Sequence, residues 1–286
     1  KNRNMKLQPL SLNLNKNEDS LEFLEDEVFD ISEFLIDPDE EVPEPIPIIA
    51  FENKGRSIPI FTEDNISMIQ GRAKSRKSTV LKAIGATIAS QGYYRHGGLL
   101  KSYYERNDFT IIDTEQGKYH CWKSAKVIKN ISGKKIKYYK VAGLSVDKKK
   151  KLVEEHLKQN PKCGILVIDN IVHFLLNYND PTESAQLNEW LIKIKADYNC
   201  HIILVLHENG SDMGNGKAKG HLGSLLENTC ETIIRVEKDK NNRSRSIVSP
   251  KEMRGEEFDS FVIEMDFQGI PYISILEEYE NTKIKI

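Results

Sequence analysis

The stretch Ile66-Ser-Met-Ile-Gln-Gly-Arg-Ala-Lys-Ser-Arg-Lys-Ser-Thr79 indicates the fold of this chain more directly than any other segment. Its first residues, Ile66–Gln70, are largely apolar and predict a buried strand, and a helical stretch follows near Ser78–Gln91. A strand that passes through a short basic loop into a helix is the arrangement of a phosphate-binding loop. The segment therefore predicts an α/β fold that binds a phosphorylated ligand.

The loop itself has the residue types that phosphate binding requires. Gly71 and the pair Lys77-Ser78 match the pattern G-x-x-x-x-G-K-[ST]. In such a loop the backbone N–H groups point at phosphate, the lysine reaches the terminal phosphate oxygens, and the hydroxyl coordinates Mg²⁺. The residues predicted to contact the nucleotide are Gly71, Arg72, Ala73, Lys74, Ser75, Arg76, Lys77, Ser78 and Thr79.

Arg76 departs from this pattern, because it stands where the second glycine is expected. If this position has a positive φ, a side chain there costs on the order of 1 kcal/mol. A guanidinium group that contacts phosphate would offset part of that cost.

Strand-like and helix-like runs alternate through the middle of the chain, which predicts a parallel sheet with helices on both faces. Before this region, Ile46–Phe51 and Ser57–Phe61 predict a hairpin around Asn53-Lys54-Gly55. The expected strands are Ile66–Gln70, Phe109–Asp113, Ile136–Val141, Gly164–Asp169 and His201–Leu206, and the expected helices lie near Ser78–Gln91, Lys118–Lys129, Lys148–Gln159 and Glu183–Ala196. Three further β-rich runs predict antiparallel edge strands: Cys230–Glu237, Ser244–Ser249 and Phe258–Asp266.

Two acidic residues follow predicted strands. Asp169 ends the apolar run Cys163–Asp169, as expected of a carboxylate that orients Mg²⁺. Glu115 lies just after a second strand, at the sheet edge where open α/β folds bind ligands. A carboxylate there can orient and deprotonate the water that attacks a terminal phosphate. The alternative is that Glu115 caps the helix that starts near Lys118.

Charge is distributed unevenly. Residues 1–50 hold 4 Lys/Arg against 13 Asp/Glu, and the remainder holds 37 against 30. We expect residues 1–45 to be an acidic arm, with one amphipathic helix over Leu21–Ile36 and a proline-rich linker, ahead of a domain over 46–286. The arm either docks on a neighbouring subunit or covers a basic groove, or it is disordered. The basic body suggests polyanion binding, and the alternative is a lysine-rich solvated surface.

Several classes of protein are excluded by composition. No apolar stretch approaches the roughly 20 residues that a membrane-spanning helix needs. The four cysteines, Cys121, Cys163, Cys200 and Cys230, lack C-x-x-C spacing. They therefore read as free thiols of a reducing compartment rather than as disulfides or zinc ligands. The sequence predicts a cytoplasmic protein without a membrane partner.

The motifs GRAKSRKST, IIDTEQ, ILVIDN, ILVLHEN and KGHLGS, in this order, resemble the RecA-like P-loop ATPase superfamily. The chain is most similar to RepA-type ring ATPases, hexameric helicases, and to related ATPases of bacterial mobile genetic elements. In that group an arginine before the loop lysine is common. The resemblance spans about Ile46 to Asp266. It implies a mainly parallel, twisted RecA-like sheet flanked by helices, with antiparallel edge strands, and it implies ATP and Mg²⁺ as cofactors.

The resemblance also implies roles for individual residues. Lys77 and Ser78 would bind phosphate and Mg²⁺, Glu115 would be the catalytic glutamate and Asp169 the second acidic residue. His207 would be the sensor of the γ-phosphate, unless it is an ordinary histidine at a strand end. Trp122, seven residues after Glu115, would stack on adenine, unless it is a partly buried core residue.

Further roles would involve DNA and a neighbouring subunit. His207–Gly223 contains five glycines, and its Lys217 and Lys219 are candidates to contact single-stranded DNA or a neighbour's ATP, unless the loop is merely flexible. Arg254 is the first candidate for a cationic finger that completes the neighbouring active site, with Lys251 assisting and Arg235 as an alternative. An active site of this kind requires a homo-oligomer, a ring or filament, with a hexamer favoured.

The sequence thus predicts a Mg²⁺-dependent ATPase that acts on DNA as a helicase or as a replication or mobilisation motor. The alternative is a nucleotide-gated switch that assembles or recruits a protein partner through the acidic arm, with little turnover. A partition-type ATPase ranks third, because Arg72 occupies the place of the extra loop lysine but the paired glycines of that motif are missing.

Overall fold

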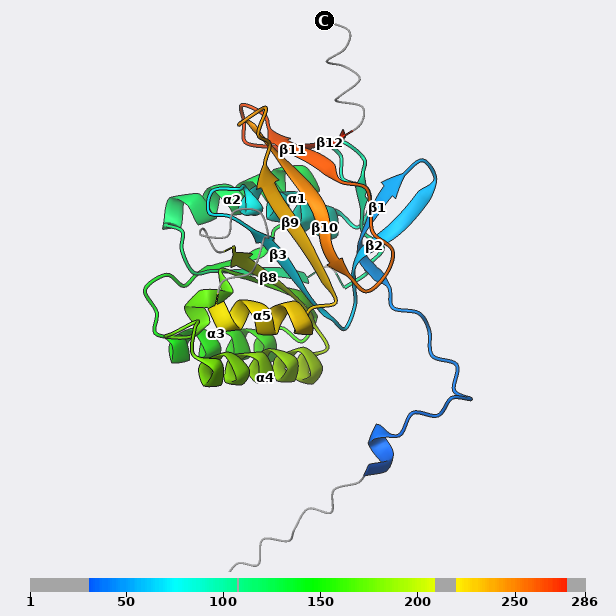
Figure 1. Cartoon of the computed structure of the whole chain (residues 1–286), viewed down its shortest axis with the longest axis vertical. Helices are drawn as coiled ribbons and strands as arrows, with labels where there is room; N and C mark the ends of the chain where they lie inside the picture. Colours follow the sequence, from blue (N-terminus) through cyan, green and yellow to red (C-terminus); the bar gives the residue numbers. More distant parts are fainter. Residues whose placement is uncertain (1–30, 107, 209–219, 277–286) are drawn as a thin grey trace, which may run out of the picture. The chain divides into compact units, whose positions relative to one another are not determined.

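The computed structural model describes residues 31–106, 108–208 and 220–276 (Figure 1). The chain divides into two units, Lys1–Pro43 and Glu44–Ile286. In the first unit, the described residues form one short 3-10 helix, η1 (Ile31–Phe34). The acidic α-helix predicted over Leu21–Ile36 is therefore absent from its described part, and the rest of that prediction lies outside the described residues.

The second unit is built on a nine-stranded sheet in the order β12-β11-β10-β9-β3-β8-β7-β5-β6. The six strands from β9 to β6 are parallel, and β10, β11 and β12 extend the sheet as an antiparallel meander. This confirms the predicted mainly parallel sheet with antiparallel edge strands. The strands are β3 (Ile66–Gly71), β5 (Asp108–Asp113), β6 (Lys137–Lys140), β7 (Cys163–Asp169), β8 (His201–His207), β9 (Thr232–Lys238), β10 (Arg245–Met253), β11 (Phe261–Met265) and β12 (Pro271–Ile275).

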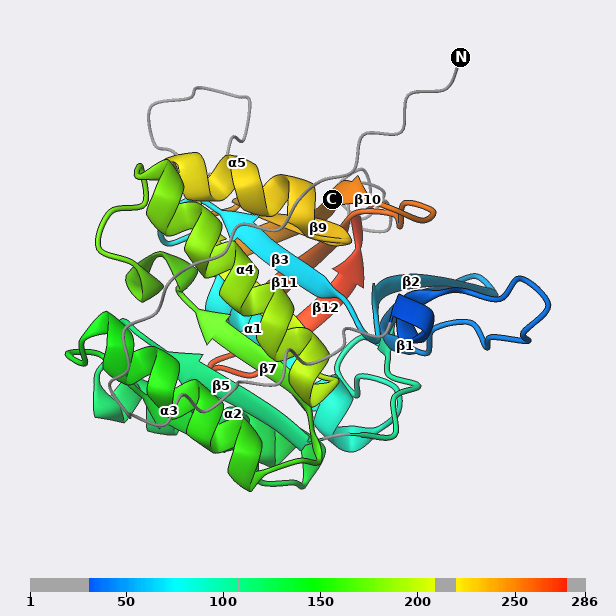
Figure 2. The ribbon, with the colours of Figure 1, turned by 90° about the horizontal axis from the view of Figure 1, so that it is seen from below.

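In the described part of the chain, five helices cover the two faces of this sheet: α1 (Lys77–Ser90), α2 (Lys118–Ser132), α3 (Val146–Gln159), α4 (Pro181–Tyr198) and α5 (Gly220–Thr229). Alternate residues of each strand point to opposite faces. Ile165 and Val167 of β7 therefore join the core under α1 and α2, whereas Leu166 and Ile168 join the core under α3, α4 and α5. Figure 2 shows α4 and α5 in front of β3, over the face opposite α1.

Two expectations about the last third of the chain were wrong. The first late β run was predicted at an antiparallel edge, but β9 is parallel to β3. The reason is α5, whose first four residues, 220–223, were expected to end the glycine-rich loop His207–Gly223. Leu222 and Leu226 lie four residues apart on one face of α5 and are fully buried, so the segment folds as a helix on the sheet. A helix of this length returns the chain for a parallel pairing.

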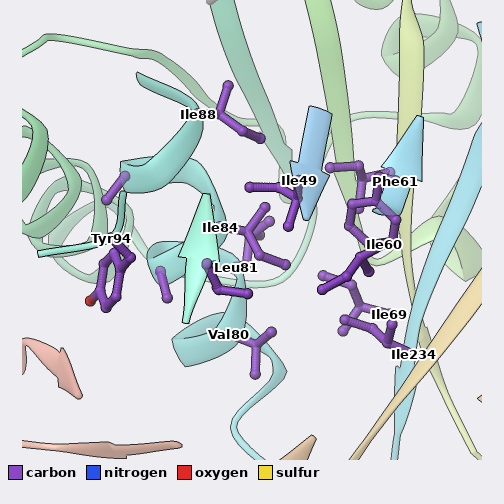
Figure 3. Packing of buried hydrophobic residues seen from close by; sticks show 14 of the residues in the cluster. Ile49, Ile60, Phe61, Ile69, Val80, Leu81, Ile84, Ile88, Tyr94 and Ile234 are labelled. Atoms are coloured by element: carbon purple, nitrogen blue, oxygen red, sulfur yellow. The ribbon is translucent and has the colours of Figure 1, made fainter. Parts of the chain in front are cut away.

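The predicted hairpin is confirmed as β1 (Pro47–Asn53) and β2 (Arg56–Thr62). Its turn residues Lys54 and Gly55 both have positive φ, of 47° and 80°, which suits the twist of a two-residue hairpin turn. With β4 (Leu100–Lys101), these strands form a separate three-stranded sheet. Its buried side chains pack with those of α1 in one hydrophobic core, as Figure 3 shows for Ile49, Ile60 and Ile84.

His201, the first residue of β8, is completely buried and stacks on Phe61 with 5.8 Å between ring centroids. Burial lowers the pKa of His201 to about 3, whereas an unfolded chain protonates histidine near pH ~6.5. Because the folded pKa is the lower one, this histidine's contribution to stability is present above that pH and is lost as the pH falls. We expect it to reduce the free energy of unfolding by about 2 kcal/mol between pH 7 and pH 5.

Urea denaturation at the two pH values measures this effect. His201→Leu keeps the apolar contact with Phe61 but has no proton to bind. Between pH 7 and pH 5, the free energy of unfolding of this variant should therefore fall by about 2 kcal/mol less than that of the wild type. Equal changes in the two proteins would contradict the prediction.

The four cysteines, which were predicted to be free thiols, are unpaired. Burial raises the pKa of the Cys121 thiol to about 11 and that of Cys200 to about 12. Within the described residues, no helix combines the length and the apolarity that crossing a bilayer requires.

Candidate functional site

The phosphate loop, residues 72–76, connects β3 to α1 at the carboxyl edge of the sheet. Gly71 ends β3 where β9 passes very close: a Cβ atom at this position would lie 2.3 Å from the Val236 carbonyl oxygen. Lys74 and Arg76 have left-handed φ values of 63° and 74°. The strained position expected for Arg76 is therefore present.

The Arg76 side chain is held by the protein. Its Nη2 donates a hydrogen bond to the Arg243 carbonyl oxygen, at 2.9 Å, in the turn between β9 and β10. The guanidinium group thus ties the loop to the edge of the sheet. The predicted contact between Arg76 and phosphate stays a prediction.

We expect Arg76→Gly to change stability little, because two effects of similar size oppose each other. Glycine removes the cost of a left-handed side chain, on the order of 1 kcal/mol, and it also removes the hydrogen bond to Arg243, worth about 1 kcal/mol. Urea denaturation should show a change below about 1 kcal/mol. A much larger loss of unfolding free energy would mean that the hydrogen bond from Arg76 to Arg243 matters more at this position than the strained backbone does.

A cavity of about 240 Å³ lies against the loop and brings together most of the predicted catalytic and phosphate-binding residues. It is lined by Lys74, Ser75, Arg76, Lys77, Ser78, Asp113, Glu115, Gln116, Asp169 and His207. Four separate segments, the loop with the start of α1 and the ends of β5, β7 and β8, therefore converge at one edge of the sheet, as ligand sites of open α/β folds do.

Lys77 is buried at the floor of this cavity, and its ammonium group makes three hydrogen bonds. Nζ donates to the carbonyl oxygens of Gly71 (2.8 Å) and Arg72 (2.9 Å), and it lies 2.9 Å from His207 Nδ1. Burial lowers the pKa of Lys77 to about 8, although the charges of Asp169 and Glu115 act in the opposite direction. All three donors are thus held by the protein, and a phosphate oxygen would take the place of one of these partners.

His207 connects Lys77 to Glu115. Since the Lys77 ammonium donates to Nδ1, the proton of a neutral His207 lies on Nε2, which is 3.5 Å from Glu115 Oε1. The same carboxylate oxygen accepts hydrogen bonds from Asn170 Nδ2 (3.1 Å) and His173 Nε2 (3.2 Å). His207 is the largest of the causes that lower the pKa of Glu115 to about 2. The carboxylate is therefore held in place and ionised.

Sequence reasoning missed three residues that position Glu115. Asp113 Oδ1 accepts hydrogen bonds from the backbone N–H groups of Glu115 (3.0 Å) and Gln116 (2.8 Å), and its Oδ2 accepts from Tyr138 Oη (2.8 Å). Asn170 and His173 lie on or before the short 3-10 helix η2 (Ile171–Phe174), which follows β7. Asp113 was detectable as a strand-end carboxylate inside the IIDTEQ motif. Asn170 and His173 follow a strand that is distant in sequence, so no spacing links them to Glu115.

Asp169 and Ser78 have the chemistry of a Mg²⁺ site. Both residues line the cavity, and burial, together with the charges of Asp113 and Glu115, raises the pKa of Asp169 to about 7. A cation would relieve this concentration of negative charge. No group of three or more metal-ligating side chains occurs in the described part of the chain. Mg²⁺ takes one or two protein oxygens and completes its octahedron with phosphate and water, and Ser78 and Asp169 would supply the protein oxygens here.

Trp122 lies apart from this cavity. It is on α2, is 53% exposed, and has Lys126 Nζ 4.8 Å from its ring centroid. The alternative of a partly buried core residue is therefore wrong. Trp122 does not line the phosphate cavity, and its stacking on adenine stays a prediction.

Two of the three candidates for a cationic finger are held within their own chain. Arg235 forms a two-pronged ion pair with the buried Glu208, with Nε 2.6 Å from Oε1 and Nη2 3.2 Å from Oε2. Lys251 donates to Gln70 Oε1 at 2.9 Å and forms a close ion pair with Glu227.

Arg254 is exposed and directly follows β10. The last residue of β10, Met253, pairs with Thr232 of β9. The register from Arg254 through Glu231 to Ile66 places Arg254 about 17 Å along the strands from Gly71. Arg254 therefore lies at the opposite edge of the sheet from its own chain's loop. The segment Ser249–Gly255, expected to join two strands, is mostly part of β10 because it pairs with β9. Lys217 and Lys219 lie outside the described residues.

No protein-family model matches this chain, and no curated protein is similar to it in sequence. Solved structures do match its fold. The RadB recombinase crystal structure aligns with a TM-score of 0.52 and 13% identity, over 75% of this chain and 91% of that one. The solved ATPase domain of a second protein aligns with a TM-score of 0.52 and 14% identity, over 75% of this chain and 86% of that domain. This chain therefore shares its fold with these two structures, and its phosphate loop lies at the carboxyl edge of its sheet.

Proposed function

We propose that this protein is a Mg²⁺-dependent ATP hydrolase of the RecA type that acts on DNA. The observation that supports hydrolysis best is the linked arrangement of Lys77, His207 and Glu115 around one cavity. A module that only bound phosphate would need the loop and Lys77, but it would not need an ionised carboxylate held by three side chains opposite them.

The residues of the cavity support a division of roles. The backbone of the loop and Lys77 would bind the β- and γ-phosphates, and Ser78 and Asp169 would hold Mg²⁺, which would neutralise charge on the phosphate oxygens. Glu115 orients the attacking water and accepts its proton. His207 donates to the γ-phosphate from Nε2 and thereby leaves Glu115. Because His207 is the largest cause of the low pKa of Glu115, its departure makes the carboxylate a stronger base when ATP is bound.

The role on DNA extends this proposal. The two matching structures are named as a recombinase and an ATPase domain, and the body of this chain after residue 50 has seven more basic than acidic residues. We assign the ATPase domain to residues 46–286 and the acidic arm to 1–45. In this proposal the active protein is a ring or filament in the cytoplasm, and Arg254 contacts the neighbour's site. The biological role that we propose for this ATPase is that of a RepA-like helicase, or of a replication or mobilisation motor, of a mobile genetic element.

A nucleotide-gated switch with little turnover is the second candidate. It is favoured by one observation: Arg235 and Lys251, two of the three finger candidates, are bound to acidic side chains of their own chain. A site that lacks a cationic finger hydrolyses ATP slowly, since such a finger is worth several orders of magnitude in rate. In that case the nucleotide would control assembly or the recruitment of a partner.

ATP hydrolysis at low salt, with and without single-stranded DNA, tests the proposal. We expect turnover that DNA stimulates and that Lys77→Ala reduces to background. Lys148→Ala, which removes an exposed lysine of α3 outside the phosphate cavity, is the matched control for the charge that is lost. If nucleotide binds but turnover is flat with DNA and insensitive to Lys77→Ala, the hydrolase proposal fails and the switch replaces it.

A further inference from the structure

Helix α2 carries two exposed aromatic rings beside lysines, outside the phosphate cavity. Tyr119 is 64% exposed and Trp122 is 53% exposed, and their ring centroids lie 5.8 Å apart. Lys126 Nζ lies 4.8 Å from the Trp122 ring centroid. Large aromatic side chains usually bury most of their surface. Two that remain exposed next to cations make this face of α2 a candidate ligand-binding surface.

The charge around these rings is of one sign. Residues 116–146 contain eight lysines and no aspartate or glutamate. Among the described residues, only Lys137 of these lysines pairs with a carboxylate, that of Asp108 at 3.1 Å. Lys126, Lys129 and Lys135 are all exposed. The surface therefore attracts polyanions, and its lysines are available to them.

A groove gives this surface its shape. It has a volume of about 370 Å³ and lies between α2 and the turn that precedes β6. Its apolar lining consists of Trp122, Ala125 and Ile136, and its cations are Lys126, Lys129 and Lys135. In this groove a flat apolar group can lie against Trp122 while negative charges lie within reach of the lysines.

We propose that the outer face of α2, defined by Tyr119, Trp122, Lys126, Lys129 and Lys135, binds single-stranded nucleic acid. A base stacks on Trp122 and the flanking phosphates contact the lysines, because a single strand alternates flat rings with charges. An acidic peptide would satisfy the lysines but would not use the exposed rings. This inference deepens the proposed function, since it names a surface through which the ATPase holds its polynucleotide.

The test uses the full chain and an oligothymidylate of about 20 nucleotides, long enough for site sizes of this kind. We expect K126E/K129E to weaken binding about tenfold or more in fluorescence anisotropy. The slope of log Kd against log salt should fall by about 1.4, as loss of two phosphate contacts predicts for a single strand. Trp122→Ala should weaken binding about tenfold through loss of stacking.

The matched control is K148E/K151E. These lysines have the same spacing, are exposed on α3, and lie on the opposite face of the sheet. We expect them to weaken oligonucleotide binding less than about threefold, through general electrostatics alone. ATP hydrolysis without DNA should be equal in both double variants and the wild type, so failure of the inference is distinguishable from failure of the proposed ATPase.

Stacking also has a spectroscopic signature. The chain has two tryptophans, Trp122 and Trp190, so Trp190→Phe leaves Trp122 as the reporter. We expect its fluorescence to be quenched by the oligonucleotide without nucleotide present. The inference is overturned if the α2 and α3 double variants lose affinity equally, if the wild type does not bind the oligonucleotide, or if ATP alone quenches Trp122. It is also overturned if a peptide of residues 17–45 binds the α2 face while K126E/K129E leaves the affinity for the oligonucleotide unchanged.

Discussion

Glu115→Gln should reduce kcat for ATP hydrolysis by about 10²–10³-fold and leave nucleotide affinity nearly unchanged. The amide fills the same space and can still accept a hydrogen bond from Asn170 Nδ2, but it cannot take a proton from water. The phosphate-binding groups, Lys77 and the loop backbone, are separate from it, so binding should persist. Steady-state hydrolysis and titration with a fluorescent ATP analogue measure the two quantities.

Glu155→Gln is the control for this substitution. Glu155 is an exposed glutamate of α3 that forms a surface ion pair with Lys158 at 3.7 Å, away from the phosphate cavity. Its change to glutamine should leave kcat within about twofold of the wild type, because surface ion pairs contribute little. If Glu115→Gln also leaves kcat within that range, Glu115 is a structural cap, and water activation must be assigned elsewhere.

The parts of the fold that sequence predicted well are those in which local chemistry decides. In the segment from β3 through the loop to α1, the local residues are enough to predict the structure. The strand is apolar, Gly71 stands where β9 approaches closely, and Lys77 begins the helix. The buried runs of β7 and β8 were equally clear, because strands covered on both faces are apolar throughout.

The parts that sequence did not predict depend on contacts between distant segments. Glycines in the KGHLGS motif favoured a loop, and only the burial of Leu222 and Leu226 against the sheet makes α5 a helix. The direction of β9 follows from that helix. Similarly, the contact between His173 and Glu115 exists because β5 and β7 are adjacent, and strand order is not encoded in the residues around either one.

Gly71→Ala should lower the free energy of unfolding by about 3 kcal/mol and weaken nucleotide binding at the same time. The added Cβ would lie 2.3 Å from the Val236 carbonyl oxygen and 2.7 Å from Ser75 Oγ, so either β9 or the phosphate loop must move. A shift of β9 breaks its parallel pairing with β3, and a shift of the loop displaces the backbone N–H groups that bind phosphate. The Cβ atom added at residue 71 is therefore expected to lower both the stability of the protein and its affinity for nucleotide.

Gly117→Ala separates this steric effect from the general cost of replacing a glycine. Gly117 has a φ of −71° and no atom within 4 Å of an added Cβ, so alanine fits there without strain. We expect its free energy of unfolding to stay within about 0.5 kcal/mol of the wild type. Urea denaturation of both variants and titration with a fluorescent ATP analogue measure the contrast. If Gly71→Ala is as stable as Gly117→Ala, β9 yields without cost, and the close approach of β9 does not explain why glycine is needed at the start of the phosphate loop.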